Sequence, residues 1–571
     1  MAEEMPLNRC KTPMAGLLRT ALAAWLAGLC LVCSAAVFAQ GTPVPLPPLP
    51  IDDEEVVEPE DVPPEIAPER SSQKVASPVP AQADQPVPEE PLTPAQAEQP
   101  PVPMGPVAPL ERTFGCQEFF PGEAPPVLQG RVDKILANKD LAGGKLSVLA
   151  VAYPEGTVIY QREADLKVNP ASVSKLFTAA AALARFGPDH RWHTEVVAGE
   201  GECPDLYLVG GGDPGLCEGD VKKLVDAVKS KGITCVEQLF YDVTFFDDQI
   251  LPPHYEEKQS DAHWRPKIGA LGMCDGNLNV RIFPGDYPDA VPRVTVEPFS
   301  SCVMIDSRAL TVETVEEKKQ LAVSVRESGG NVVVQVTGQI PMKSSNGVLV
   351  RKAIPQPDQF TACFARDMLR SRGIEVRQKT LIAKVAPAGA KPIATLASDP
   401  LQTDLRRMQR WSKNFVAEQF AKLMGEGRCA PLTFKCGLRV IRQSLARFHL
   451  NHRCLQLENG SGLFDANRVS AGQVVRLLIE VANQKEWGEL YMLALPLGGK
   501  SGTLMDRMKN VKRPVRAKTG TLDYHSSVAG YIERRGGGYV VFAILMAETK
   551  TSAYRMRRIQ DQVVGVLATH R

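Results

Sequence analysis

One stretch of the sequence, residues 169–183, constrains the fold more than any other. It reads Asn-Pro-Ala-Ser-Val-Ser-Lys-Leu-Phe-Thr and continues into an alanine-rich run that ends at Leu183. The Asn-Pro pair discourages an earlier helix start, so the sequence predicts a helix that begins near Ser172 and carries Lys175 on the same face, one turn later. A serine hydroxyl is a weak nucleophile until a base removes its proton, and a desolvated lysine can be that base.

By itself this Ser-x-x-Lys spacing is weak evidence, because serine is common as a helix cap. Ser71-Ser72-Gln73-Lys74 has the same spacing and lies in a segment that cannot form an active site. Residues 41–110 alternate Pro, Ala, Val, Gln and acidic residues, and they include no aromatic residue. Such a composition cannot bury a core, so we expect residues 40–112 to be a Pro-rich disordered spacer.

The N-terminus predicts export. A basic start precedes an uncharged run over residues 21–39, which ends in Val37-Phe38-Ala39 and suits signal-peptidase cleavage before Gln40. The run is also nearly long enough to remain as a membrane anchor. We therefore expect residues 1–39 to be a signal peptide or an anchor, and the protein to be periplasmic or otherwise extracytoplasmic.

Charge and cysteine content limit the partners. The formal net charge of +1 gives no reason to expect nucleic acid, and any membrane tether would be the N-terminal segment. Three of the 13 cysteines lie in residues 1–39, which leaves an even number of ten in the exported part, where disulfides can form. Sequence alone leaves the connectivity open, and the pairs close enough to consider are Cys203/Cys217, Cys274/Cys302 and Cys429/Cys436. No zinc-ligand spacing is present, so we expect no metal.

Folded sequence begins near Phe114. A helix is expected over residues 127–136, followed by a strand hairpin from residues 145–151 and 158–160, and then by the serine helix. A hairpin that leads into a helix is typical of an α+β fold.

From Trp192 to about Ala394 the chain changes to short strands broken by Gly, Pro and Asp, with helices at residues 220–231 and 360–371. This part has the pattern of a self-contained insertion. Helical periodicity returns from Leu405 to Leu423. The C-terminal part predicts a hairpin from strands at 526–532 and 539–546, closed by a helix at 552–567.

Two further short motifs follow the serine. Ser412-Lys413-Asn414 lies within the periodic helical stretch, and Lys518-Thr519-Gly520-Thr521 immediately precedes the C-terminal hairpin. Each motif has a second copy. Ser344-Ser345-Asn346 is followed by Gly347, which indicates a surface turn, and Lys500-Ser501-Gly502-Thr503 leads into a helix-like segment at 504–508. We therefore take Ser412 and Lys518 as the functional copies.

Ser-x-x-Lys, Ser-x-Asn and Lys-Thr-Gly in this order resemble the active-site set of serine penicillin-recognising enzymes. The long gap between Ser172 and Ser412 resembles the D-alanyl-D-alanine carboxypeptidase/endopeptidase family, the class C low-molecular-mass penicillin-binding proteins, which carry inserted domains there. The resemblance extends from about Pro125 to the C-terminus. Its supporting stretches are Leu206–Leu216, Asn459–Leu463, Asn467–Ser470, and Gly502-Thr503-Leu504 with Arg507.

The resemblance implies an α+β fold, with a serine β-lactamase/DD-peptidase-like catalytic domain whose antiparallel sheet is flanked by helices and whose chain is interrupted by a mostly β insertion. We expect residues 113–195 and 393–571 to form the catalytic domain and residues 196–392 the inserted domains. The implied activity is that of a serine D,D-peptidase that removes terminal D-Ala from peptidoglycan stem peptides and can also cleave D-Ala crosslinks. β-Lactams would inhibit it, and no cofactor is expected. A β-lactamase and a non-catalytic wall-binding protein on the same fold remain the alternatives.

The residues suit acyl transfer. Ser172 would attack the substrate carbonyl, and Lys175 would be the base, with a pKa lowered by burial and by the neighbouring Lys518. Ser412 would relay the proton to the leaving amine, and Asn414 would bind the substrate amide and help to fix Lys175.

The remaining motif suits substrate binding. Lys518 with the hydroxyls of Thr519 and Thr521 would bind the terminal carboxylate, and the backbone N–H groups of Ser172 and Thr521 would form the oxyanion hole. Glycine suits position 520, because a side chain there would obstruct a substrate lying along the strand.

Two residues need separate interpretation. Lys413 stands where many relatives carry Asp, and we expect its side chain to point away from the cleft. His525 and Asp523 could suggest a Ser-His-Asp triad, but the sequence has no Gly-x-Ser-x-Gly elbow, so His525 is expected to be structural or near the substrate.

Overall fold

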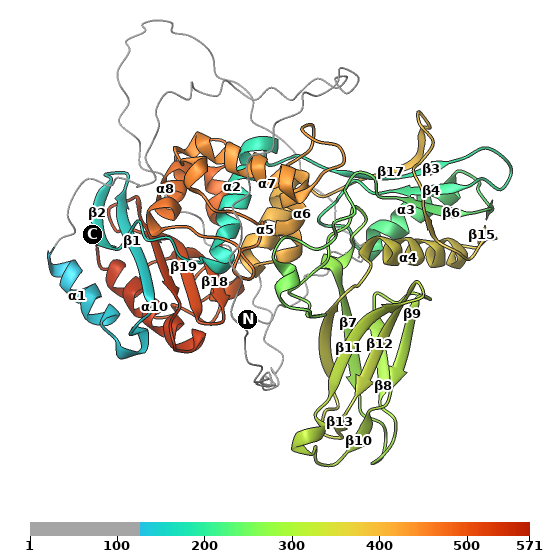
Figure 1. Ribbon diagram of the computed structural model, residues 1–571, viewed down its shortest axis with the longest axis horizontal. Coiled ribbons are helices and arrows are strands. Elements are labelled where there is room, and N and C mark those ends of the chain that lie inside the picture. Colours follow the sequence, from blue (N-terminus) through green and yellow to red (C-terminus); the bar gives the residue numbers. More distant parts are fainter. Residues whose placement is uncertain (1–125, 571) are drawn as a thin grey trace, which may run out of the picture. The chain divides into compact units, whose positions relative to one another are not determined.

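The computed structural model describes residues 126–570, and the predictions for residues 1–39 and 40–112 lie outside them. A five-stranded antiparallel sheet joins the two ends of the described chain, in the order β18-β19-β20-β1-β2 (Figure 1). Its strands are β1 (Lys145–Tyr153), β2 (Thr157–Arg162), β18 (Val515–Leu522), β19 (His525–Glu533) and β20 (Tyr539–Ala547).

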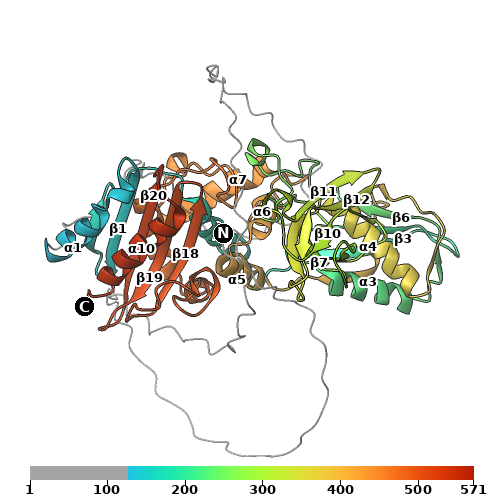
Figure 2. The ribbon, with the colours of Figure 1, turned by 90° about the horizontal axis from the view of Figure 1, so that it is seen from below.

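Helices cover both faces of this sheet. On one face α1 (Pro126–Leu136) and α10 (Ala553–Leu567) share a core with alternate residues of β20, among them Phe542 and Ile544. The intervening β20 residues are also buried, because successive side chains of a strand point to opposite faces and α8 (Ala471–Ala482) packs against this strand too. Figure 2 shows α1 and α10 beside the strands they cover. The predicted α+β class with an antiparallel sheet flanked by helices is confirmed.

A helical layer stands beside the sheet and surrounds the serine helix. α2 (Lys175–Phe186) contacts α5 (Leu401–Trp411), α6 (Asn414–Leu423) and α7 (Phe434–Leu445), and a short helix, α9 (Gly488–Leu493), lies beside α8. The four alanines at residues 179–182 of α2 are fully buried, and their small side chains let the neighbouring helices approach closely.

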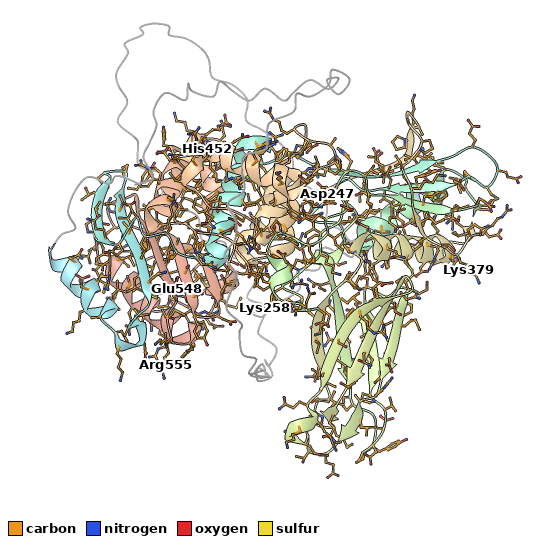
Figure 3. The ribbon with its side chains drawn as sticks, viewed as in Figure 1. Asp247, Lys258, Lys379, His452, Glu548 and Arg555 are labelled. Atoms are coloured by element: carbon orange, nitrogen blue, oxygen red, sulfur yellow. A yellow bond between two sulfur atoms is a disulfide. The ribbon has the colours of Figure 1, made fainter. Side chains whose placement is uncertain are left out.

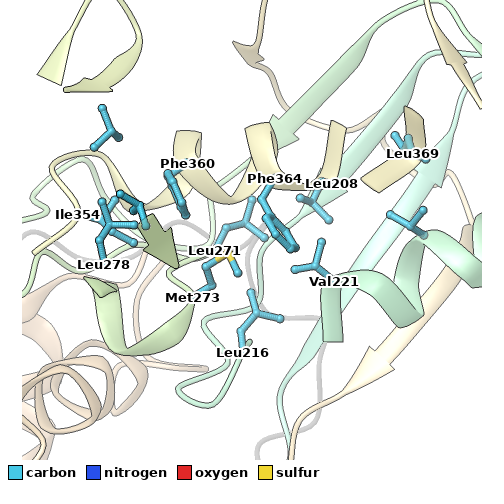
Figure 4. Close-up of a cluster of buried hydrophobic side chains, with 14 of the residues drawn as sticks. Leu208, Leu216, Val221, Leu271, Met273, Leu278, Ile354, Phe360, Phe364 and Leu369 are labelled. Atoms are coloured by element: carbon cyan, nitrogen blue, oxygen red, sulfur yellow. The ribbon is translucent and has the colours of Figure 1, made fainter. Parts of the chain in front are cut away.

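The residues between α2 and α5 form sheets of their own. One is a mixed sheet in the order β16-β6-β4-β3-β17, with α3 (Glu218–Ser230) and α4 (Pro357–Ser371) packed near it. Phe360 and Phe364 of α4 lie in its core among apolar residues that include Leu208 and Val221 (Figure 4). The strands of this sheet and a short pair beside it are β3 (His193–Ala198), β4 (Leu206–Val209), β5 (Cys235–Val236), β6 (Leu239–Asp242), β15 (Glu375–Val376), β16 (Ile382–Ala383) and β17 (Pro392–Ala397).

A set of smaller sheets completes this part of the chain. They have the strand orders β14-β7-β8, β11-β12-β9 and β10-β13. Their strands are β7 (Asn277–Phe283), β8 (Arg293–Glu297), β9 (Val303–Ser307), β10 (Leu310–Val312), β11 (Ala322–Ser328), β12 (Asn331–Thr337), β13 (Gln339–Pro341) and β14 (Val348–Ala353). The expected mixture of short strands with two helices is therefore confirmed in this segment.

Two local predictions were wrong. The periodic stretch over residues 405–423 is two helices, because the chain breaks at Ser412. The helix-like segment at 504–508 contains only a short 3-10 turn, Gly502–Leu504. The Lys518 motif precedes the C-terminal hairpin, as predicted, and it forms part of β18, which pairs with β19 and adds a third strand to that hairpin.

The cysteine pairing corrects two of the three suggested pairs. The described disulfides are Cys203–Cys235, Cys302–Cys363 and Cys429–Cys436, of which only the last was suggested by proximity in sequence. Folding brings Cys203 to within 4.9 Å of Cys235 between their Cα atoms, whereas Cys217 and Cys274 carry free thiols. Within residues 126–570 no helix combines the length and the apolar character needed to cross a bilayer.

Candidate active site

The chain bends sharply before the serine helix. Ser172 lies in a 3-10 turn, Ala171–Ser174, and the α-helix proper begins at Lys175. The side chain of Asn169 holds the turn by accepting a hydrogen bond from the Ala171 N–H at 2.9 Å and donating to the Phe464 carbonyl at 2.9 Å. A third hydrogen bond holds the turn, in which the Ser174 hydroxyl accepts from the Asn467 side-chain amide at 2.9 Å.

The Ser172 hydroxyl contacts the ammonium nitrogen of Lys175 at 2.7 Å, so its side chain faces the lysine instead of capping the helix. Lys175 is fully buried. Its Nζ also donates to Asn414 Oδ1 at 2.7 Å and to the Ser461 carbonyl at 2.9 Å. A neutral amine has two N–H bonds and one lone pair. With both N–H bonds directed to these oxygens, the lone pair would face Ser172.

A buried carboxylate, Glu418, holds the backbone segment that contains the Ser461 carbonyl. Glu418 accepts backbone hydrogen bonds from Ser461 at 2.8 Å and from Gly460 at 3.1 Å, and Tyr255 lies 3.0 Å from the Ser461 hydroxyl. Burial raises the pKa of the Glu418 carboxyl. Sequence reasoning missed Glu418, although it lies one turn after Asn414 on the same helix.

Ser412 occupies the break between α5 and α6. Its backbone is in the left-handed region, with φ of 59°, which is uncommon for a residue other than glycine and is frequently found at functional sites. This conformation turns the hydroxyl to accept a hydrogen bond from Lys518 Nζ at 2.8 Å. Asn414 then begins α6 and donates to the Trp264 carbonyl at 2.6 Å, which orients its amide toward Lys175.

The Lys518 motif lies on β18, the edge strand of the sheet. Lys518 is fully buried and also donates to the Thr519 carbonyl at 2.8 Å. A Cβ added at Gly520 would lie 2.6 Å from the Pro170 carbonyl oxygen and 2.9 Å from the Ser172 nitrogen. Glycine is therefore required here because β18 packs directly against the turn that carries Ser172. The sequence had suggested a different reason, namely that a side chain at this position would obstruct the substrate.

These residues meet in one cleft. Ser172, Ser412, Asn414, Thr519 and Thr521 line it, while Lys175 and Lys518 lie buried behind them. The cleft also has lining residues that the sequence did not single out as site residues, and these are His263, Trp264, Asp275, Asn277, Trp411, Phe415, Leu463, Thr503, Arg507 and Arg557.

One of the motif copies that we set aside contributes to the cleft after all. Thr503, in the Lys500-Ser501-Gly502-Thr503 stretch, accepts a hydrogen bond from the Thr519 hydroxyl at 2.7 Å. The other copy, which starts at Ser344, is a turn outside the cleft, closed by a hydrogen bond from Gly347 to the Ser344 carbonyl at 2.9 Å.

Lys413 does not point away from the cleft, contrary to our expectation. It lines the cleft and lies 3.0 Å from Asp275, a residue between α2 and α5 in the chain. Asp275 also pairs with Arg407 at 2.5 Å. Burial alone would raise the pKa of Asp275, but the charges of Arg407 and Lys413 outweigh it and lower that pKa to about 2. The lysine in the Ser-x-Asn motif thus has an acidic partner from a distant part of the chain.

The neighbouring histidine is neutral near pH 7. Burial lowers the pKa of His263 to about 4, and the charges of Arg351, Lys413 and Lys352 contribute in the same direction. By contrast, His525 is no member of a triad. Its Nδ1 lies 2.6 Å from the backbone oxygen of Asp523, whose carboxylate is exposed and paired with Lys258 (Figure 3).

In the described part of the chain, no group of three or more His, Cys, Asp or Glu side chains is placed to hold a metal ion. The cleft instead offers a hydroxyl beside a buried amine, a second hydroxyl beside a second buried amine, and an edge strand. This arrangement suits acyl transfer through a serine ester.

Comparisons with known proteins agree with this chemistry. The sequence matches the D-Ala-D-Ala carboxypeptidase 3 (S13) family over residues 128–570. A D-alanyl-D-alanine carboxypeptidase of Actinomadura sp. (strain R39) is 30% identical over 431 residues, which cover 71% of this chain and 78% of that protein. A carboxypeptidase of Mycobacterium tuberculosis is 24% identical over 435 residues, covering 72% of this chain and 78% of that protein.

Solved structures share the fold. The crystal structure of penicillin binding protein 4 from Haemophilus influenzae superposes with a TM-score of 0.67 at 20% identity, covering 77% of this chain and 99% of that one. The same protein in complex with a β-lactam gives a TM-score of 0.62 at 21% identity, covering 76% of this chain and 98% of that one.

Proposed function

The chain belongs to the D-Ala-D-Ala carboxypeptidase 3 (S13) family, and from this premise we propose how its cleft carries out the reaction of a serine D,D-peptidase. The protein is a serine-type peptidase that hydrolyses D-Ala-D-Ala bonds of peptidoglycan stem peptides. The observation that carries the mechanism is the 2.7 Å contact of Ser172 with the buried Lys175.

Acylation begins with proton transfer from Ser172 to Lys175. Full burial favours the neutral form of the lysine, and its two carbonyl partners keep the lone pair directed at the hydroxyl. The Ser172 oxygen attacks the carbonyl carbon of the penultimate D-Ala, and the carbonyl oxygen becomes an oxyanion that the N–H groups of Ser172 and Thr521 stabilise.

Collapse of the tetrahedral intermediate breaks the amide bond and leaves an ester on Ser172. The leaving amine takes up a proton that passes from Lys175 through Ser412, whose hydroxyl is held by Lys518 at 2.8 Å. Water then attacks the ester by the same route in reverse, and the shortened stem peptide leaves.

Substrate binding uses the edge of β18. The peptide lies along this strand, Asn414 holds its amide, and Lys518 with Thr519 and Thr521 faces the terminal carboxylate. A β-lactam presents a carboxylate and a strained amide to the same groups, so penicillin would acylate Ser172. Endopeptidase action on a crosslinked stem is a second reaction that we propose for the same site.

The remaining assignments concern the whole chain. We propose that residues 1–39 direct export, that residues 40–112 form a spacer, and that residues 196–392 are domains inserted into a catalytic domain made of residues 113–195 and 393–571. The uncharged run at 21–39 supports the first of these proposals, and the separate sheets between α2 and α5 support the last. The site of action would then be outside the cytoplasm.

The experiment incubates the full-length protein with a stem pentapeptide, with a crosslinked muropeptide dimer and with benzylpenicillin, and follows each by mass spectrometry. Release of D-Ala from the pentapeptide is the expected result. Cleavage of the dimer would show that the protein also has endopeptidase activity. Turnover of penicillin without peptide cleavage would identify a β-lactamase. Binding of the dimer without any cleavage would identify a non-catalytic wall-binding protein.

A further inference from the structure

A cation from the last helix reaches the cleft beside the Lys518 motif. Arg557, on α10, is half-buried and lines the same cleft as Ser172 and Thr521. Its Nη2 donates a hydrogen bond to the Thr521 hydroxyl oxygen at 3.0 Å. The three active-site motifs assign no role to this residue, which lies 36 positions after Thr521 in the chain.

The turn of α10 that carries Arg557 is fixed to the rest of the site. Arg507, another lining residue of the cleft, donates to Asp561 at 2.6 Å and to Gln560 at 3.1 Å. Gln560 is fully buried and accepts a further hydrogen bond from Ser526 of β19 at 3.3 Å. Arg557 therefore extends from an anchored turn, unlike a surface arginine that is free to move.

The direction of the hydrogen bond to Thr521 is fixed by chemistry. A guanidinium carries five N–H donors and no acceptor, so the Thr521 oxygen must accept from Arg557. A threonine hydroxyl has one proton, which is then available for a different acceptor. Because Thr521 lines the cleft, that acceptor can be a group of the substrate.

We propose that Arg557 is a positioning residue for the free carboxylate at the end of the substrate. It holds Thr521 as a donor to that carboxylate and brings a second positive charge to the end of the cleft where Lys518 lies. A charge-assisted hydrogen bond is stronger than a neutral one, and a site built to bind a charged group rejects an analogue that lacks it. The inference rests on the proposed D,D-peptidase function and adds to it selectivity for peptides with an unblocked C-terminus.

The test compares two thioester substrates that differ only in charge, an N-acyl-D-alanyl thioglycolate and its methyl ester. Values of kcat/KM are measured for the full-length wild-type protein and for Arg557→Ala, Arg557→Lys and Arg558→Ala. Arg558 is the matched control, because it is an exposed cation on the same helix and does not line the cleft. Arg555 is less suitable, since it pairs with Asp140 at 3.1 Å and holds α10 to the N-terminal part of the domain (Figure 3).

We expect Arg557→Ala to lower kcat/KM on the order of 10- to 100-fold for the free carboxylate and by less than about threefold for the methyl ester. Arg557→Lys keeps a cation and should recover part of the loss, and Arg558→Ala should leave both rates near those of the wild type. Equal losses on the two substrates would show a merely structural role and overturn the inference, as would an equal effect of Arg558→Ala. Inactivity of the wild type on both thioesters would overturn the proposed function and the inference together.

Discussion

Asp275 Oδ2 lies 3.0 Å from Lys413 Nζ, so the chain between α2 and α5 provides a carboxylate for the lysine that stands between Ser412 and Asn414. Here the positive charge is in the motif and the negative charge is in the segment packed against it. The pair thereby links the segment that carries Asp275 to the break between α5 and α6, where Ser412 is placed.

Replacing Asp275 with Asn should destabilise the protein. The substitution leaves Lys413 and Arg407 without their shared partner in a site where the Asp275 side chain is only 17% exposed, and we expect a loss of about 3 kcal/mol in the free energy of unfolding. Urea unfolding checks this value. The control is Asp226→Asn, since Asp226 forms an exposed pair with Arg372 and should cost about 1 kcal/mol or less. Equal losses for the two variants would contradict the account.

The contribution of the Asp275 carboxylate to the stability of the fold should depend on pH in a defined direction. The pKa of Asp275 is about 2 in the folded protein against an ordinary value of 3.8, so the ionised form favours folding. Its contribution is complete above about pH 4 and is lost as the pH falls towards 2, by about 2 kcal/mol in all. Asp275→Asn should lack this component of the acid destabilisation.

Sequence reasoning found the part of the site that short-range geometry determines. Ser172 and Lys175 are three residues apart at a helix start, and Lys518 is next to the hydroxyls of Thr519 and Thr521. Local spacing therefore brings these groups together, and the order of the three motifs distinguished them from their second copies. The fold class followed from the hairpin before Ser172 and the hairpin after Lys518, which pair as β1 and β20 in one sheet.

The rest of the site depends on contacts between distant segments. Asp275, Glu418 and Arg557 come from three elements far apart in the chain, and nothing in their local sequence distinguishes them from other charged residues. The break at Ser412 was missed for a different reason. Apolar residues keep their helical spacing through α5 and α6, while the left-handed backbone of one residue between them has no periodic signature.

Gly520→Ala should slow acylation on the order of 100-fold. The added methyl group would lie within 3.0 Å of Pro170 and Ser172 backbone atoms, so β18 or the turn of Ser172 must shift, and a displacement of about 1 Å can cost on the order of 100-fold in rate. The measurement is the second-order rate constant for acylation by a fluorescent penicillin.

Gly536→Ala is the matched control for this substitution. Gly536 lies beyond β19 in the turn before β20, with a negative φ, and an added Cβ there would meet no atom within 4 Å. Its acylation rate should equal that of the wild type. An unchanged rate for Gly520→Ala would show that the close approach of β18 to Ser172 is not needed.

His263 should contribute a separate acid sensitivity. Its pKa is about 4 in the folded protein against an ordinary value of 6.5, because burial and three nearby cations favour the neutral ring. The neutral ring stabilises the fold above about pH 6.5, and that stabilisation is lost as the pH falls towards 4, by about 3 kcal/mol. His263→Gln should lose correspondingly less stability over this range in urea unfolding at several pH values.

His452→Gln is the control, since this partly exposed residue lies away from the cleft (Figure 3). It should follow the wild-type dependence on pH. If His263→Gln also followed the wild type between pH 6.5 and 4, the buried neutral histidine would not be the group responsible.

The central claim is that Ser172 is the nucleophile and that Lys175 activates it. It is tested most directly by incubating the wild type, Ser172→Ala and Ser344→Ala with benzylpenicillin and locating the adduct by mass spectrometry of proteolytic peptides. Ser344 belongs to the motif copy that lies outside the cleft. We predict one penicilloyl group on the peptide that contains Ser172 in the wild type and in Ser344→Ala, and none in Ser172→Ala. A penicilloyl adduct that persists in Ser172→Ala would contradict the assignment.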